Sequence, residues 1–556
     1  MSNTAAVGTG GVGKRITADA MEAGRMSRRR PRALKLLSVP GLWVFSGAFV
    51  FILFCLFRLS GVPIWMDGDQ AIWLQDGQRM FFGEVLYRDF FQMTFPGTDL
   101  LYLWAFKIFG LRNWIPNALL VVVGATLTWL IYFISRRVLS ARGALVPPLF
   151  FLTLVFRGLL DASHHWLSIL CCAGAVAVLV DGRTPRRLFF AGLLCGLAAC
   201  FTQSHGVALL AGLAAFLFFE RQTSGERVVS VGLVGRFGIL AGGFLLAVLA
   251  ITLPFVRWAG VRRFLFCTAV YVARYYSAFG EGSNWRGYMI GLPGKLEMHV
   301  WYLGAFLLIH LLLPLIYVLA LLRYQRGTLT GDRQRMGRLL LIIFSGLFLF
   351  LSVAAGPSWN RLYYVSFPAL ILFGWLLENA GTAGRLVLDA TLCGTVLLAM
   401  SIPVRVQLHT LEYMDLPGER TAFLHPERID RYRWLMAQTH PLEYVFSPFS
   451  PDYYFLLRLR NPATVPVVSP SDFTRPEDVT SAIEGLERHQ VRLVMWAAEL
   501  DLPKNPATDH LGPLRAYLRE HYCAAKNFDD EEVLVRTEHR SANGACPGLV
   551  SVSRRE

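Results

Sequence analysis

Long apolar runs alternate with short basic segments along most of the chain, and this pattern predicts a polytopic α-helical membrane protein. A helix needs about 20 mainly apolar residues to cross the hydrocarbon of a bilayer. Runs of roughly this kind lie near 41–60, 114–134, 143–157, 165–180, 187–202, 205–219, 232–256, 299–322, 338–355, 360–377 and 385–403. We therefore expect about 11 transmembrane helices within a membrane domain at 41–404.

Arginine placement gives these spans a direction. Residues 1–40 are Gly-rich and strongly basic, and we interpret them as a disordered cytoplasmic tail ahead of an uncleaved first span. Alternation then puts the other arginine clusters, near 136–142, 183–187, 221–236 and 323–338, in the cytoplasm. The loop at 61–113 and the segment after about Arg405 then lie on the outer face of the cytoplasmic membrane. The short break CFTQSHG is the weak point, because one broken helix over 187–219 would invert everything downstream, an inversion that the arginines argue against.

Composition supports this interpretation. The sequence is 54% hydrophobic and carries a net charge of +15, and its basic excess falls between the apolar runs. Such an excess marks cytoplasmic loops and lipid contacts, so we expect no nucleic-acid partner. Six cysteines lie inside apolar runs, where Cys behaves as a small hydrophobe: Cys55, Cys171, Cys172, Cys195, Cys200 and Cys393.

The last 150 or so residues have a different pattern. Residues 405–556 are charged and punctuated by proline, with helix-like segments at 427–439 and 475–489 and strand-like segments at 443–447 and 491–497. A small soluble α/β domain outside the cytoplasm fits this pattern. Its two cysteines, Cys523 and Cys546, would meet an oxidising compartment there, so we expect them to form a disulfide.

The first outer loop is rich in aromatic residues. Gln70–Phe82 and Thr98–Phe109 have helical apolar spacing, which predicts two helices lying in the membrane interface. Asp67 and Asp69 precede the first of these helices. A carboxylate there could act as a general base or hold a divalent cation, or the two residues could simply cap the helix, and spacing alone does not separate these alternatives.

Several residues of this loop resemble one family. The run Asp69, Gly83, Tyr87-Arg88-Asp89 and Pro96-Gly97, directly after a first span, resembles the first periplasmic loop of GT-C glycosyltransferases. The likeness is to the bacterial branch related to dolichyl-phosphate-mannose protein mannosyltransferases and the lipid A aminoarabinose transferase. The family has Asp-Glu at its first motif, whereas this chain has Asp69-Gln70, with Asp67 as a second carboxylate. That departure leaves open whether a metal is used and which Asp is the base.

The resemblance implies a hexosyl- or pentosyltransferase with a polyprenyl-phosphate sugar donor and a lipid, glycan or protein acceptor. Inverting transfer needs a base on the acceptor hydroxyl and positive charge near the leaving phosphate. Asp69 is the candidate base, with Asp67 as its partner or substitute, and both are candidate ligands of a divalent metal. Tyr87, Arg88 and Asp89 are candidate substrate contacts.

Other outer residues extend this candidate site, each with a plainer alternative. Asp161, His164 and His165 lie in one short loop and could bind the donor phosphate or orient the acceptor, or else anchor the interface beside a tryptophan. Arg361 could bind a phosphate or reach toward lipid headgroups. The loop at 257–298 could form a lid, with Arg274 and Lys295 as phosphate contacts. Lone His310 in a span is expected to be a helix-packing residue.

Two other functions compete with sugar transfer. A transporter or flippase of lipid-linked saccharide predicts charged residues inside the spans, and the spans hold almost none. A glycan polymerase or ligase predicts an elaborate loop late in the chain, whereas here the first loop is the elaborate one.

Overall fold

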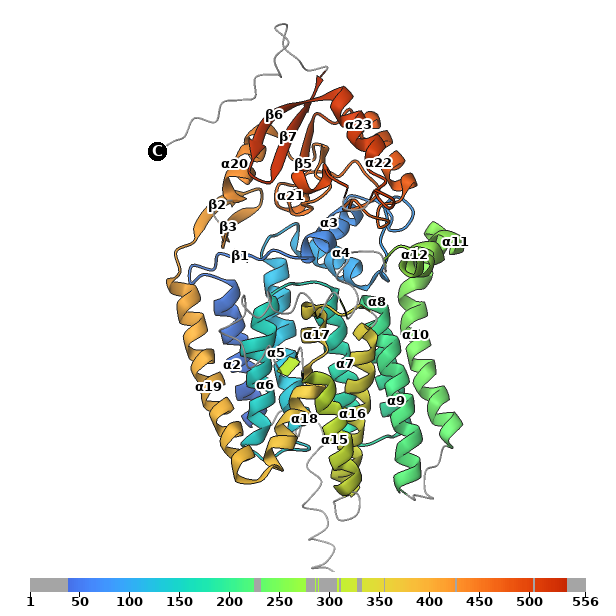
Figure 1. The fold of residues 1–556 in the computed structure, drawn as a ribbon, viewed down its shortest axis with the longest axis vertical. Coiled ribbons are helices and arrows are strands. Elements are labelled where there is room, and N and C mark those ends of the chain that lie inside the picture. Colours follow the sequence, from blue (N-terminus) through green and yellow to red (C-terminus); the bar gives the residue numbers. More distant parts are fainter. Residues whose placement is uncertain are drawn as a thin grey trace, which may run out of the picture.

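A computed structural model describes most of the chain from the first span into the tail domain (Figure 1). The described residues are 39–224, 232–276, 312–327, 333–354, 356–425, 428–503 and 506–537, with Arg286, Met289, Leu308 and Ile309. Residues 1–38 of the expected tail at 1–40, Lys295 and His310 lie outside them, and Val39 and Pro40 begin the first helix.

A bundle of long helices forms the larger part of the molecule (Figure 1). Its members are α2 (Val39–Leu56), α5 (Ile115–Ser135), α6 (Val146–Phe150) with the turns that continue it to Leu159, α7 (His164–Val180), α8 (Pro185–Phe201), α9 (Gln203–Ser224), α10 (Leu233–Ala259), α15 (Leu313–Gly327), α16 (Arg333–Ala354), α17 (Trp359–Tyr364), α18 (Phe367–Glu378) and α19 (Gly381–Leu408). Large apolar side chains stay exposed on the outer helices, such as Leu253 on α10 and Met400 on α19. Lipid is the solvent that suits such faces, and the chain is a multi-pass membrane protein.

The helices follow the predicted apolar runs closely. In the described part, six are long and apolar enough to cross a membrane: α2, α5, α9, α10, α16 and α19. Shorter apolar helical segments cover Gly143–Leu159, His164–Val180 and Phe367–Glu378. The break at CFTQSHG separates α8 from α9, as the arginines favoured. The run at 299–322 is described mainly at its end, in α15, so the count of eleven spans stays a prediction.

A layer of two short helices lies between the bundle and the tail domain (Figure 1). These are α3 (Gln70–Phe81) and α4 (Gly97–Phe109), so both helices predicted in the first loop are confirmed. They cross closely, since a Cβ on Gly77 of α3 would lie 2.7 Å from Cβ of Tyr102 on α4. At the edge of the bundle, α10 is followed by α11 (Val261–Leu265), a short π-helical stretch and α12 (Tyr271–Arg274).

Two buried carboxyl groups face each other within this layer. Asp76 of α3 and Asp99 of α4 are both fully buried, and the charge of Asp76 acts on Asp99. Gln92 Nε2 donates to Asp76 Oδ2 at 2.8 Å. Burial raises the pKa of both carboxyl groups, and the Asp76 charge raises the pKa of Asp99 further. The pair therefore retains a proton under conditions in which exposed carboxyl groups are ionised.

The tail domain is built on two sheets. A four-stranded sheet has the order β4-β5-β7-β6, from β4 (Val445–Phe446), β5 (Leu493–Ala497), β6 (Tyr522–Phe528) and β7 (Glu531–Arg536). The second sheet contains the antiparallel strands β2 (Glu412–Leu416) and β3 (Glu419–Phe423). Helices α20 (Ile429–Gln438), α21 (Asp452–Leu456), α22 (Pro476–Arg488) and α23 (Gly512–His521) pack around these strands.

The first loop joins the tail domain directly. Strand β1 (Ile64–Trp65), just after the first span, pairs in parallel with β3, placing Ile64 opposite Ala422. The ends of the first and last spans are bonded as well, because Arg58 donates to the carbonyl of Val406 at 2.7 Å. The first loop and the tail domain therefore lie at the same end of the bundle, as the alternation of spans predicted.

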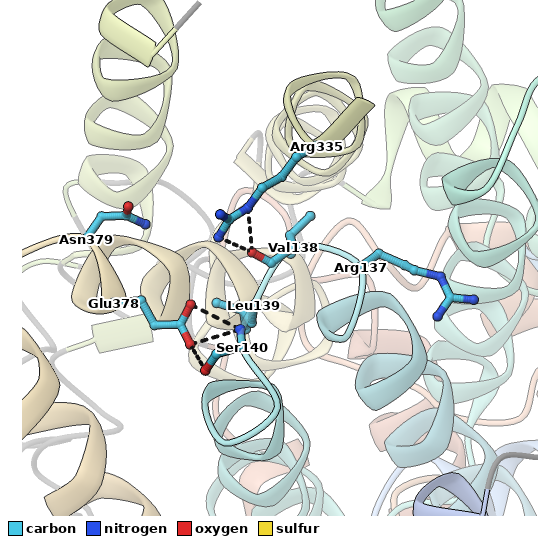
Figure 2. Close-up of a pocket in the computed structure, with 7 residues that line it drawn as sticks. All are labelled: Arg137, Val138, Leu139, Ser140, Arg335, Glu378 and Asn379. Atoms are coloured by element: carbon cyan, nitrogen blue, oxygen red, sulfur yellow. Dashed lines mark hydrogen bonds between the residues drawn. The ribbon is translucent and has the colours of Figure 1, made fainter. Parts of the chain in front are cut away.

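The opposite end of the bundle holds the basic loops. Arg137 pairs with Asp181 at 2.7 Å, and Arg183 pairs with Glu220 at 3.0 Å, so these loops bind one another. A cavity of about 440 Å³ lies there. Figure 2 shows the residues that line it: Arg137, Val138, Leu139, Ser140, Arg335, Glu378 and Asn379. Arg335 donates to the carbonyl of Val138, and Glu378 accepts from Ser140. Because these groups bond to one another, the residues that line the cavity hold the loop after α5 in place.

Candidate active site

Asp69 begins the first interfacial helix without capping it. The residue occupies the N-cap position of α3, yet its side chain makes no capping hydrogen bond. Gly68 before it has a φ of +137°, a conformation that favours glycine. Asp69 as a residue is exposed to solvent, while the surrounding protein partly desolvates its carboxyl group. The Asp69 side chain therefore does not cap the helix.

Asp161 supplies the cap instead, from the short loop before α7. Its Oδ1 accepts from the backbone N–H of Gln70 at 2.9 Å, and a Cβ on Gly68 would lie 3.1 Å from its Cγ. The Gln70 side chain completes the link: Nε2 donates to the carbonyl of Met66, and Oε1 accepts from the N–H of Ala162 at 3.1 Å. A Glu at position 70 could not donate to Met66. Asp161 and Gln70 thus fix the start of α3 and leave the Asp69 carboxylate uncommitted.

The two carboxyl groups differ in their electrostatic surroundings. Desolvation by the surrounding protein raises the pKa of Asp69, and the nearby Arg361 guanidinium opposes that rise. Desolvation also raises the pKa of Asp161, and the charge of Asp69 raises it further. A proton shared between them therefore favours Asp161, and Asp69 keeps the negative charge.

Arg361 lies at the start of α17 and is held from two sides. One guanidinium nitrogen donates to the carbonyl of Gly356 at 2.8 Å, and the other donates to the Tyr276 hydroxyl. Its charge lies within electrostatic range of Asp69. A positive charge near a carboxylate suits a site that handles an anionic group.

Three histidines form a stacked cluster beside these groups. The rings of His164 and His165 lie 4.0 Å apart, and His165 stacks on Tyr364 at 4.4 Å. His205, from the start of α9, lies 5.6 Å from His165. The charge of Arg361 reaches all three histidines. The sequence hypothesis omitted His205 and Tyr364, although the polar break that contains His205 was visible within the apolar runs.

Asp67 is committed elsewhere. Its Oδ1 lies 2.8 Å from Arg428 Nη1, and its Oδ2 lies 4.0 Å from His425 Nε2, both in the tail domain. The described residues contain no group of three or more His, Cys, Asp or Glu side chains placed to hold a metal ion. Asp67 therefore already has its ion-pair partner in the tail domain and does not act with Asp69 as the expected pair.

The polar turn after α3 lies within a buried structural region. Tyr87 is fully buried with a φ of +67°, and its hydroxyl donates to the carbonyl of Thr94. Arg88 forms an ion pair with Asp89 at 2.8 Å, and the Asp89 carboxylate also accepts from the N–H of Val85. These contacts close the turn on itself. Among the described residues, no hydrogen bond or ion pair of these three residues reaches Asp69. Arg274, at the end of α12, is exposed.

Cys523 of the tail domain is disulfide-bonded. Its expected partner, Cys546, lies outside the described residues. Cys55, Cys171, Cys172, Cys195 and Cys200 are free and buried, and Cys393 is free and exposed. The five buried thiols agree with their interpretation as small apolar residues.

Comparison with known proteins identifies the fold. No protein-family model matches the chain, and no curated protein matches it in sequence. The structure of ArnT from Cupriavidus metallidurans in the apo state superposes with a TM-score of 0.57 at 14% identity, covering 92% of this chain and 100% of that one. The structure of the same ArnT bound to undecaprenyl phosphate gives a TM-score of 0.54 at 15% identity, covering 92% and 99%. The chain has the fold of the GT-C glycosyltransferases.

Proposed function

We propose that this chain of GT-C fold is a membrane glycosyltransferase that moves a sugar from a polyprenyl phosphate to an acceptor hydroxyl. The site would lie on the outer face of the cytoplasmic membrane, where the first loop and the tail domain meet. The observation that carries the proposal is the Asp69 carboxylate, which makes no capping hydrogen bond because Asp161 caps α3 in its place. The positive charge of Arg361 lies within electrostatic range of this carboxylate. The ArnT of the same fold binds undecaprenyl phosphate, which supports a lipid-linked donor here.

The arrangement suits an inverting displacement. The acceptor oxygen would attack the anomeric carbon as its proton passes to Asp69, and the bond from that carbon to the phosphate oxygen would break. Arg361 would stabilise the charge that remains on the departing polyprenyl phosphate. Asp161, which favours the shared proton, would keep Asp69 ionised and oriented for this role.

The histidine cluster suits a supporting role beside the phosphate. His164 is oriented by Phe201 and Thr202, whose carbonyl and hydroxyl oxygens lie 3.3 Å and 3.2 Å from its Nδ1. Because the His165 ring stacks on Tyr364 and lies 4.0 Å from the His164 ring, it is held in one orientation. The cluster would thus present fixed imidazole groups to the donor head group.

Product identification tests the proposal. Purified protein would be incubated with a panel of polyprenyl-phosphate sugars and acceptor lipids, glycans and peptides, and products would be identified by mass spectrometry. Transfer from at least one donor is expected, and no transfer from any donor would refute the proposed function.

A substitution then tests the base. Asp69→Asn should lower turnover by about 100-fold or more while the protein still binds donor, because general-base catalysis contributes factors of this size. Asp415→Asn is the matched control, since Asp415 lies on β2 and pairs only weakly, with Arg420 at 4.0 Å. Near wild-type turnover of Asp69→Asn would exclude Asp69 as the base.

A further inference from the structure

The tail domain holds the residue two positions before the candidate base. Arg428, just ahead of α20, places Nη1 2.8 Å from Asp67 Oδ1. The carboxylate of Asp452, itself bonded to the Tyr432 hydroxyl, attracts the same guanidinium from the tail side. The Arg428 guanidinium therefore lies in a negative environment that the first loop and the tail domain both create.

The segment between Asp67 and Asp69 is short and anchored at both ends. Upstream, β1 is paired with β3, and the N–H of Ala422 donates to the carbonyl of Pro63 at 2.9 Å. Downstream, Asp161 caps α3 at Gln70. Gly68 lies between these two anchors, and as a glycine it can adopt backbone conformations that other residues rarely adopt. A side-chain contact at Asp67 is well placed to select one conformation of this glycine hinge.

The ion pair is too exposed to be a major source of global stability. The side chain of Arg428 is 42% exposed, and that of Asp67 is 33% exposed. Pairs this accessible to water contribute little to folding, because solvent screens the charges. A contact that adds little to stability but lies two residues from the Asp69 carboxylate acts mainly on local geometry.

We propose that Arg428 is a positioning residue that acts through Asp67 to orient Asp69, so that the tail domain completes the active site. This inference rests on the proposed sugar transfer with Asp69 as base. A displacement of about 1 Å in a reacting group can lower a rate by about 100-fold. Loss of Arg428 would therefore lower turnover without removing any group that touches the donor.

Kinetics of matched variants test the inference. Arg428→Ala should lower kcat at least tenfold and leave the KM for the donor and the melting temperature unchanged. Arg433→Ala is the control, because Arg433 lies on α20 with a side chain 50% exposed and pairs only within the tail domain, with Glu412 and Asp430. It should retain wild-type kcat. Arg428→Lys, which keeps the charge, should recover part of the lost turnover.

A double-mutant cycle separates positioning through the pair from a general structural effect. If Arg428 acts through Asp67, Asp67→Ala should lower kcat to a similar extent, and the double variant should lose no more than either single variant. Independent, multiplying losses would overturn the inference, as would wild-type kcat in Arg428→Ala. A fall in melting temperature in Arg428→Ala with no recovery in Arg428→Lys would also overturn it. Absence of transfer by the wild-type protein would instead refute the proposed function.

Discussion

The buried carboxyl pair of the interfacial layer predicts an unusual pH dependence of stability. Asp76 and Asp99 lie on α3 and α4, fully buried, and the Gln92 amide donates to only one of their four oxygens. Asp76→Asn replaces a protonated carboxyl group by a neutral group of the same shape. The Asn oxygen can still accept from Gln92, and its amide can donate to Asp99. The substitution therefore keeps the contacts and removes the titration of Asp76, while Asp99 stays in both proteins.

The size of the effect follows from one proton. The pKa of Asp76 is raised in the folded state, so the folded chain keeps a proton that the unfolded chain releases above about pH 4. The stability that this proton contributes is fully present below the unfolded pKa and is lost as the pH rises toward the folded pKa. The slope is about 1.4 kcal/mol per pH unit well below the folded pKa and falls as the pH approaches it, so about 2 kcal/mol is lost between pH 5 and pH 7. Asp76→Asn should be free of this loss.

Melting curves of the detergent-solubilised protein from pH 5 to pH 7.5 measure the difference. The melting temperature of Asp76→Asn should rise relative to wild type by a few degrees across this range. Asp89→Asn is the control in the same loop, because the Arg88 hydrogen bond lowers the pKa of Asp89 and puts its titration below the range. Its offset from wild type should not change with pH. Parallel curves for Asp76→Asn and wild type would show that the pair carries no extra proton.

Three further predictions concern packing, the start of α3 and orientation. Gly97→Ala should lower the free energy of unfolding by about 2 kcal/mol or more, because its Cβ would lie 2.6 Å from the backbone oxygen of Cys200. Gly242→Ala is the control, since a Cβ there meets open space, and it should not lower this free energy. Equal melting temperatures for Gly97→Ala and wild type would refute the clash. Gln70→Glu should cost about 1–3 kcal/mol and lower turnover, since a carboxylate cannot donate where the amide does; unchanged melting and kcat would contradict this. A reporter enzyme active only outside the cytoplasm should be active when fused after Arg405, and an inactive fusion that is fully expressed would invert the topology.

Local pattern was sufficient for the helices of this protein. Helical apolar spacing placed Gln70–Phe82 and Thr98–Phe109 within a residue of α3 and α4. This works because the apolar residues of an interfacial helix recur along the sequence with the period of the helix. The same reasoning placed 427–439 and 475–489 on α20 and α22. Strands β6 and β7 were not predicted, since β6 is exposed or part-buried over most of its length, and β7 buries the charged residues Glu531 and Arg536, which a hydrophobic pattern does not mark as core positions.

The candidate site was only partly visible in the sequence, because its decisive contacts join distant segments. Asp69, Asp161 and Arg361 were proposed from their loops and do share one electrostatic environment. That Asp161 would cap α3 depends on a contact across 91 residues, which no local pattern encodes. The ion pair that commits Asp67 to Arg428 spans 361 residues and was equally out of reach.

The pairing of β1 with β3 has a consequence for biosynthesis. The chain emerges from the ribosome in order, so β1 enters the outer compartment long before its partner strand exists. Ile64 can pair with Ala422, and Asp67 with Arg428, only after the last span has been inserted. A nascent or truncated chain would therefore hold an incomplete site, and transfer activity would report that membrane insertion has reached its end.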